Sequence, residues 1–143
     1  MDQTNINWYI YNEEEYVQDN DYYLGSFTSS STITLSIQVW NNRYGSIEID
    51  TIENARLNLS FDSIEDAALF NYCTVTVNNS IKEMDIENGS AIIDIGILSG
   101  QTNDGLENNL NKDNYKNIEI KFTNMPNNLK NGLKNLYLNI EDD

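Results

Sequence analysis

Carboxylates are the most numerous side chains of this sequence that could carry acid–base chemistry. The 143 residues contain 23 Asp and Glu, 8 Lys and Arg and no histidine, which gives a formal net charge of -15. A pair of carboxylates can hydrolyse a glycosidic bond, provided that one of them lies in a cleft with a raised pKa. The acidic residues instead form short clusters spread along the chain, at 13–15, 19–21, 62–66, 104–107 and 141–143. No cleft is indicated, so we expect a protein that is not an enzyme and has no catalytic residue.

Two features of the composition exclude further kinds of site. Without histidine the chain cannot form a Ser-His-Asp site, a Cys-His site or a histidine-containing zinc site. A single cysteine cannot form a cysteine-only zinc site or an intrachain disulfide. Residues 19–21 and 103–108 offer oxygen ligands for calcium, but neither places a glycine and a glutamate where a helix–loop–helix calcium site needs them. We therefore expect neither a metal nor a cofactor.

The net charge also limits the partners that the chain can bind. A charge of -15 disfavours binding to nucleic-acid phosphates and to anionic membranes. The sequence has no apolar run long enough to span a membrane. The first residues, MDQTNINWYIYNEEEY, lack the basic start and apolar core of a signal peptide. We expect neither nucleic acid nor membrane as a partner, and synthesis in the cytoplasm without secretion.

Alternation of apolar and polar residues predicts the strands that must position these groups. The clearest strand is 31–40, in which Ile33, Leu35, Ile37 and Val39 face one way, while Trp40 has the parity of the polar face. Residues 55–61 alternate equally well. Further strands are predicted at 47–50, 73–77, 81–87, 90–98, 118–122 and 133–140, the fourth of these with Ile93, Ile95 and Ile97 on one face.

One short helix and several turns connect these strands. Ser63 is a suitable N-cap for a helix of about two turns that ends near residue 72, with Ile64, Ala67 and Ala68 on its apolar side. Because strands precede and follow it, we expect this helix to cross over between strands. Asn88-Gly89 predicts a hairpin turn, Asn41 to Gly45 predicts a turn or tight loop, and Pro126 to Asn128 predicts another turn. Residues 99–117 are predicted to form a long polar loop.

These elements predict an all-β fold, an antiparallel Ig-like β-sandwich of about seven to nine strands with one short crossover helix and an N-terminal arm. A local pattern points the same way: Asp66, Ala68, Tyr72 and Cys73 are followed by a predicted strand. This run resembles the E–F corner of immunoglobulin-type sandwiches, where an Asp, a small residue, a Tyr and a Cys lead into strand F. Here Tyr72 adjoins Cys73 instead of preceding it by two residues, and the second cysteine of that family's disulfide is missing. The resemblance implies an Ig-like topology.

We divide the chain into residues 1–28, an acidic aromatic arm or first strand, and residues 29–143, the sandwich domain. The first segment carries six acids, and no basic residue occurs before Arg43. It either packs on its own domain or docks on a neighbouring subunit, against the lysine-rich stretch 112–134. Our candidate interface residues are rings of the arm and of the first clear strand, together with lysines of that stretch: Trp8, Tyr9, Tyr11, Tyr22, Tyr23, Trp40, Lys112, Lys116 and Lys121.

The chain is acidic, rich in Asn, Ile and Tyr, and has strands such as SIQVWNNRYGSIEID and ARLNLSF. In this overall character it resembles bacteriophage virion proteins. The resemblance implies a non-enzymatic structural subunit of the virion, made in the host cytoplasm. Such a subunit is a capsid auxiliary or decoration protein, or a tail or baseplate component, and it binds major capsid or tail proteins or copies of itself.

Two alternatives stay open at this point. The first is an acidic decoy protein that mimics nucleic acid, which the charge of -15 suggests. The second is a carbohydrate-binding β-sandwich module that presents exposed aromatic rings, with Trp40 as the candidate ring.

Overall fold

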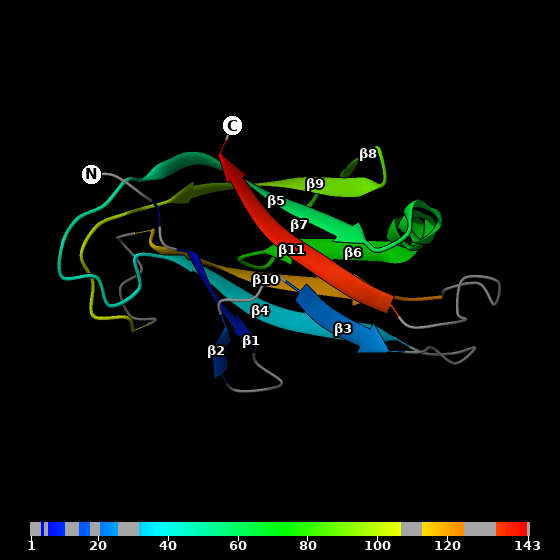
Figure 1. Ribbon diagram of the computed structural model, residues 1–143, viewed down its shortest axis with the longest axis horizontal. Coiled ribbons are helices and arrows are strands. Elements are labelled where there is room, and N and C mark those ends of the chain that lie inside the picture. The colour runs from blue at the N-terminus through cyan, green and yellow to red at the C-terminus, as the bar shows by residue number, and fades with distance from the viewer. Residues whose placement is uncertain are drawn as a thin grey trace.

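Two antiparallel β-sheets pack face to face in the computed structural model (Figure 1). The structure describes residues 4, 6–10, 15–17, 21–25, 32–106, 113–124 and 134–142. Sheet A has the strand order β2 (Glu15–Val17), β1 (Ile6–Ile10), β4 (Ile33–Asn41), β10 (Tyr115–Phe122), β6 (Cys73–Val77) and β7 (Ser80–Lys82). Sheet B has the order β3 (Asp21–Gly25), β11 (Lys134–Asp142), β5 (Ile52–Phe61), β9 (Ser90–Leu98) and β8 (Asp85–Glu87). The predicted all-β sandwich is confirmed.

The described ranges contain eleven strands, more than the predicted seven to nine. Residues 1–28 supply three of them: β1 pairs with β4 of sheet A, β2 pairs with β1, and β3 pairs with β11 of sheet B. The predicted strand 81–87 is two strands, because the chain leaves sheet A after β7 and enters sheet B at β8. The predicted turn at Pro126 lies outside the described residues.

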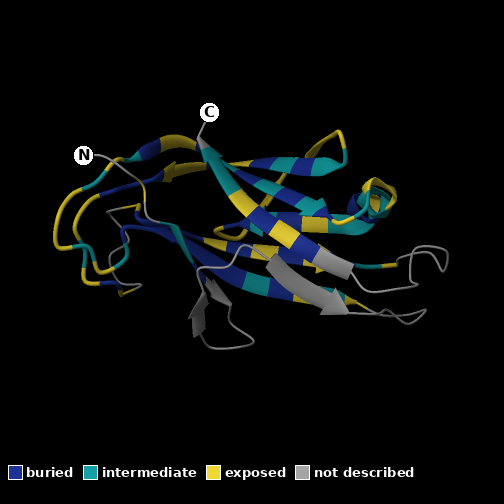
Figure 2. Cartoon of the chain, in the orientation of Figure 1, coloured by how far each residue is buried: buried dark blue, intermediate teal, exposed yellow. Residues whose placement is uncertain are grey.

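The core lies between the sheets and follows the predicted alternation. Buried residues alternate with more exposed ones along the strands (Figure 2). Leu35, Ile37 and Val39 of β4 and Leu57 and Leu59 of β5 are all buried, as predicted. The other strands add inward side chains at Trp8, Val75, Val77, Ala91, Ile93, Ile118, Ile120, Phe122, Leu136 and Leu138.

The predicted inward position of Ile97 is wrong. Ile93 and Ile95 are buried, but Ile97 is 40% exposed and Leu98 is buried in its place. Gly96 has a φ of +90°, and the register between β5 and β9 shifts where Gly96 lies opposite Ala55. This irregularity reverses the alternation of β9, because one residue steps out of the ladder.

The expected strand at 47–50 is also wrong. Residues 46–50 form a loop, and Ile47 is 74% exposed. The Asn41 side chain donates to the Asp50 carbonyl of this loop, and the Asn42 side chain donates to the Ile47 carbonyl. Both carbonyls therefore have a hydrogen-bond partner without a neighbouring strand. At the same end of the molecule, the predicted polar loop ends earlier than expected, because β10 already begins at Tyr115.

The crossover helix is confirmed as a 3-10 helix, η1 (Ile64–Tyr72), which leads from β5 of sheet B to β6 of sheet A. The Glu65 N–H donates to Ser63 Oγ over 3.2 Å, so Ser63 caps the helix. The predicted apolar side is wrong at Ile64, which is exposed beside Gly89, whereas Leu69 and Phe70 enter the core. The Asn88-Gly89 hairpin turn is confirmed, and both of its residues have a positive φ.

Candidate functional site

Buried asparagines hold together the loops at one end of the sandwich, on the left of Figure 1. These loops are residues 42–51 between β4 and β5, residues 99–106 after β9, and residues 113–114 before β10. The Asn42 amide donates to the carbonyls of Ile47 and Gly100 over 2.9 and 2.8 Å. The Asn114 amide donates to the carbonyls of Asn41, Ser99 and Gln101 over 3.2, 2.7 and 2.9 Å. These bonds give hydrogen-bond partners to main-chain carbonyls at the end of β4 and in the loops.

Asn103 ties two of these loops to each other. Its amide nitrogen donates to the Asn42 carbonyl over 2.7 Å. Its side-chain oxygen accepts from the backbone N–H of Tyr44 over 3.1 Å and from that of Gly105 over 2.8 Å. Hydrogen bonds of this kind each contribute about 1 kcal/mol, and together they fix the path of the loops before any partner arrives.

Among the residues of these hydrogen-bonded loops, Tyr44 has an unusual backbone conformation and an exposed ring. Its φ of +61° is a left-handed backbone conformation that bulky residues rarely adopt, and its side chain is 59% exposed. Strain of this kind persists only where the surroundings impose it, and it is concentrated at binding and active sites. Here the bond from the Tyr44 N–H to Asn103 helps to impose it.

A stack of side chains supports the Tyr44 ring from below. The guanidinium carbon of Arg43 lies 4.1 Å from the centre of the Tyr44 ring and 5.4 Å from the Trp40 ring. Tyr115 stacks on Trp40 with 4.5 Å between the ring centroids. Arg43 Nε also donates to the Gly105 carbonyl over 3.1 Å. Tyr44 is therefore presented on a packed and hydrogen-bonded base.

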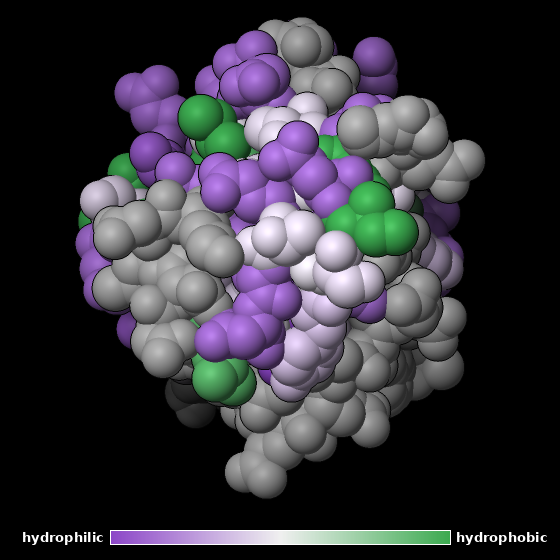
Figure 3. Space-filling model, turned by 90° about the vertical axis from the view of Figure 1, so that its left-hand side faces the viewer, coloured by the Kyte–Doolittle hydropathy of each residue, from purple (hydrophilic) through white to green (hydrophobic). Residues whose placement is uncertain are grey.

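Two apolar side chains accompany Tyr44 on the same loops. Ile47 is 74% exposed and Leu106 is 51% exposed. We call Arg43, Tyr44, Ile47 and Leu106 the loop-end surface. Figure 3 views this end of the molecule, where hydrophobic residues stand apart from one another among hydrophilic ones. Sequence reasoning treated Asn41 to Gly45 as a turn only; the tyrosine within that turn was the signal that it missed.

The structure does not gather the predicted interface residues on one surface. The Trp8 ring lies in the core between the sheets, and the Trp40 ring is buried on the outer face of sheet A. Lys116 is buried between the sheets, and Lys121 is exposed on β10. Tyr9 lies in β1, and Tyr22 and Tyr23 lie in β3, where the structure describes the backbone. Tyr11 and Lys112 lie outside the described residues.

The sugar-binding alternative required an exposed Trp40 ring, and the structure buries that ring. Trp40 is 0% exposed although it points to the outer face of sheet A. Tyr115 is its direct cross-strand neighbour and stacks on it, and Arg43 lies over it. A sugar ring therefore has no access to its face.

Lys116 is buried, whereas Lys82 and Lys121 are exposed. Lys116 lies opposite the inward-facing Val39, so its side chain enters the space between the sheets. Burial lowers the pKa of Lys116, Asp113 at 3.9 Å opposes this by favouring the ammonium, and Lys82 lowers the pKa further by repulsion.

The single cysteine has a raised pKa. Burial raises the pKa of Cys73 to about 12, and a hydrogen bond with the Lys121 backbone lowers it by a smaller amount. At neutral pH this thiol stays protonated, so it is not a nucleophile.

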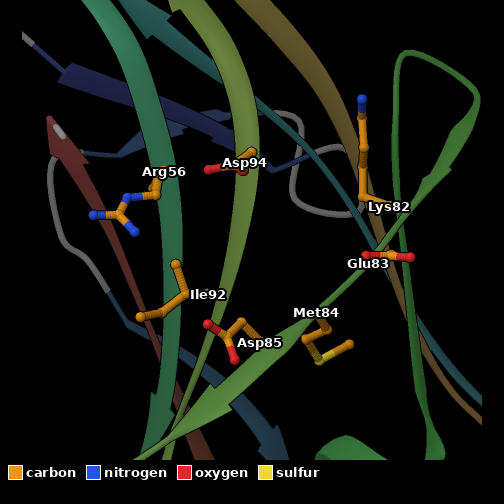
Figure 4. Close-up of a pocket in the computed structure, with 7 residues that line it drawn as sticks. All are labelled: Arg56, Lys82, Glu83, Met84, Asp85, Ile92 and Asp94. Carbon is orange, nitrogen blue, oxygen red and sulfur yellow. The ribbon is translucent and has the colours of Figure 1, made fainter.

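A hollow of about 540 Å³ lies where the chain crosses from β7 to β8 (Figure 4). It is lined by Arg56, Lys82, Glu83, Met84, Asp85, Ile92 and Asp94. Because charges of both signs line it, the hollow presents no single sign of field to an ionic ligand. In the ranges that the structure describes, no group of three or more Asp, Glu or Cys side chains is placed to hold a metal ion. No helix in those ranges is long and apolar enough to cross a membrane.

Compared with known proteins, the chain matches no protein-family model and no curated protein sequence at a significant level. Its function is therefore inferred from the geometry of its surface.

Proposed function

We propose that this chain is a non-enzymatic structural subunit of a bacteriophage particle, which docks on neighbouring virion proteins through the loop-end surface. The observation that carries the proposal is the exposed Tyr44 ring, held on a strained backbone by Asn103 and supported by Arg43. Tyrosine and arginine are the residue types that, with tryptophan, most often dominate the binding energy of protein interfaces.

The fixed loops favour binding at this end. A loop that must become ordered on binding loses affinity through the entropy of its side chains and backbone, whereas a loop that is already held does not. Asn42, Asn103 and Asn114 hold these loops through bonds between protein groups. The ring of Tyr44 and the side chains of Ile47 and Leu106 then supply apolar area for the contact.

The assignment to a phage particle rests on the resemblance of the chain to virion proteins. The segment SIQVWNNRYGSIEID carries part of that resemblance, and it contains Arg43, Tyr44 and Ile47 of the loop-end surface. The excess of acidic residues suits a subunit that contacts proteins and not the packaged nucleic acid.

The location of the protein tests the subunit role. We expect quantitative mass spectrometry of purified phage particles to find the chain in a fixed ratio to the major capsid or tail protein. If the chain is absent from particles, the subunit role is wrong.

A pair of tyrosine variants tests the surface. Tyr44→Ala should raise the Kd for particles by about thirtyfold or more, since removing a ring that dominates an interface costs about 2 kcal/mol or more. Tyr137→Ala, which removes a partly exposed ring from the outer face of sheet B, is the matched control and should bind like the unaltered chain. If Tyr44→Ala binds normally, this surface is not the contact.

A further inference from the structure

A polar groove crosses the outer face of sheet A. Two hollows, of about 220 and 300 Å³, share Asn79 and Asn117 and so adjoin each other. The first also takes in Ser36, Thr76 and Glu119 from three neighbouring strands, and the second takes in Asn78, Asp113 and Tyr115. None of these residues belongs to the loop-end surface.

The side chains along the groove offer hydrogen bonds more than charge. Carboxamides supply both donors and acceptors, and the hydroxyls of Ser36 and Thr76 do the same. The charged side chains among the described lining residues are the carboxylates of Asp113 and Glu119, which accept hydrogen bonds and repel anions. The groove thus matches a ligand that is neutral and rich in hydroxyl groups.

A buried chain of hydrogen bonds fixes the orientation of Asn117. The Trp40 indole N–H can only donate, and it donates to Gln38 Oε1 over 2.9 Å. Gln38 must then present its amide nitrogen to Asn117, and it donates to Asn117 Oδ1 over 2.9 Å. The Asn117 amide nitrogen consequently lies on the side away from Gln38. Because Trp40 and Gln38 are fully buried, this orientation is set within the fold.

The turn beside Asn117 is fixed as well. Asn78 and Asn79 have φ values of +49° and +69°. The Asn117 N–H donates to Asn78 Oδ1 over 3.0 Å, and the Asn78 N–H donates to the Asn117 carbonyl over 2.8 Å. The exposed Asn79 is therefore held at a constant distance from β10, and the polar groups of the groove are in place before a ligand binds.

We propose that this groove binds a neutral oligosaccharide. Its hydroxyls exchange hydrogen bonds with Asn79, Asn117 and the carboxylates, whereas Tyr115, only 8% exposed and stacked on Trp40, offers no ring face to a sugar. Trp40 is not the surface that contacts the sugar. It acts from beneath, as a positioning residue for Gln38 and Asn117.

The test uses the full chain and a printed array of neutral, sialylated and sulfated oligosaccharides, followed by calorimetric titration of the saccharides retained. We expect retention of neutral saccharides. Asn79→Gly removes one amide while keeping the left-handed backbone, and Asn117→Asp keeps the acceptor for Gln38 while removing the donor. Each should weaken binding by about tenfold, the effect of one or two lost hydrogen bonds.

Asn58→Ala serves as the matched control, because it removes an amide from the outer face of sheet B and should leave binding unchanged. Thermal melts of all three variants verify that they fold. The proposal is overturned if the unaltered chain retains no saccharide, if it prefers sialylated or sulfated saccharides, or if the two groove variants bind like the unaltered chain.

Discussion

Arg43 and Tyr44, neighbours in sequence, stack on each other, with the guanidinium carbon 4.1 Å from the centre of the ring. Neighbouring residues of a strand point to opposite faces, so this contact is possible only because the chain turns sharply here. The turn thereby joins the exposed ring to the packed rings of Trp40 and Tyr115.

Arg43→Lys should show how much this contact contributes. The substitution keeps the charge but removes the planar group and the Nε bond to Gly105. We expect a loss of about 1 kcal/mol, seen as a fall in melting temperature of about 4 °C. Near-ultraviolet circular dichroism should also change, because the aromatic rings lose a fixed neighbour. An unchanged spectrum and melting temperature would show that the stack is not stabilising.

Asn42→Gly should destabilise the fold strongly even though glycine suits its φ of +58°. The loss has a chemical cause: the carbonyls of Ile47 and Gly100 both lose the Asn42 amide as a donor, and the buried Gly100 carbonyl is left with the Ile49 N–H. We expect a cost of about 2 kcal/mol by urea denaturation. The same substitution at the exposed Asn79, whose φ of +69° is similar, should cost less than about 0.5 kcal/mol. Equal effects at the two positions would contradict the role of the Asn42 amide.

Two glycine substitutions should differ in cost because their causes differ. At Gly96 a Cβ has room, with Lys116 Cε 3.8 Å away, so Gly96→Ala should cost about 1 kcal/mol through its φ of +90° alone. At Gly100 a Cβ would lie 2.1 Å from the Ile49 carbonyl oxygen, so Gly100→Ala must move the backbone. We expect about 3 kcal/mol for it. Urea denaturation of the two variants measures both losses of stability, provided that the free energy of unfolding falls with urea concentration at the same slope in each. A larger loss for Gly96→Ala than for Gly100→Ala would contradict the tight packing of the loop around Gly100.

Lys116→Met should raise stability at neutral pH and change its pH dependence. The pKa of Lys116 is lower in the folded chain than the ordinary 10.5, mainly because of burial. Below the lowered pKa both states carry the proton, and the folded state bears the full cost of the buried charge. As the pH rises from the lowered pKa towards 10.5, the unfolded state binds more protons than the folded state, so stability rises.

The variant removes this rise, so its advantage over the unaltered chain should shrink as the pH approaches 10.5. Melting temperatures of both proteins between neutral and alkaline pH measure the difference. Lys121→Met, at an exposed position of the same strand, is the control and should give a constant difference. A constant difference for Lys116→Met as well would show that its burial does not govern its titration.

Strand alternation could be predicted wherever the strand segment itself carries no extra residue. Residues 33–39 and 55–61 are such cases, and their inward sides were predicted correctly. Ile97 was not, since its direction depends on an irregularity at Gly96 that periodicity does not contain. Trp40 shows a different limit. Its outward parity was correct, but burial on that face comes from Tyr115 and Arg43, which lie 75 and 3 residues away in the sequence.

The candidate site was less predictable than the fold. The segment Asn41 to Gly45 has the composition of a turn, and this was read correctly. It is a candidate site because the side chain of Asn103, nearly sixty residues later in the sequence, accepts a hydrogen bond from the Tyr44 N–H. No local sequence pattern predicts a hydrogen bond between residues so far apart. Because the sequence contains many asparagines, the few buried ones could not be distinguished from the exposed ones.

The amides of Asn42 and Asn114 bond to main-chain carbonyls of the loops, and not to the side chains that the loops display. The carbonyl of a residue stays the same whatever side chain that residue carries. Positions 44, 47 and 106 can therefore be exchanged while these amide bonds are kept. The main-chain path of these loops therefore does not depend on the side chains at their surface. Substitutions at these positions can change which partner is bound while the fold stays the same.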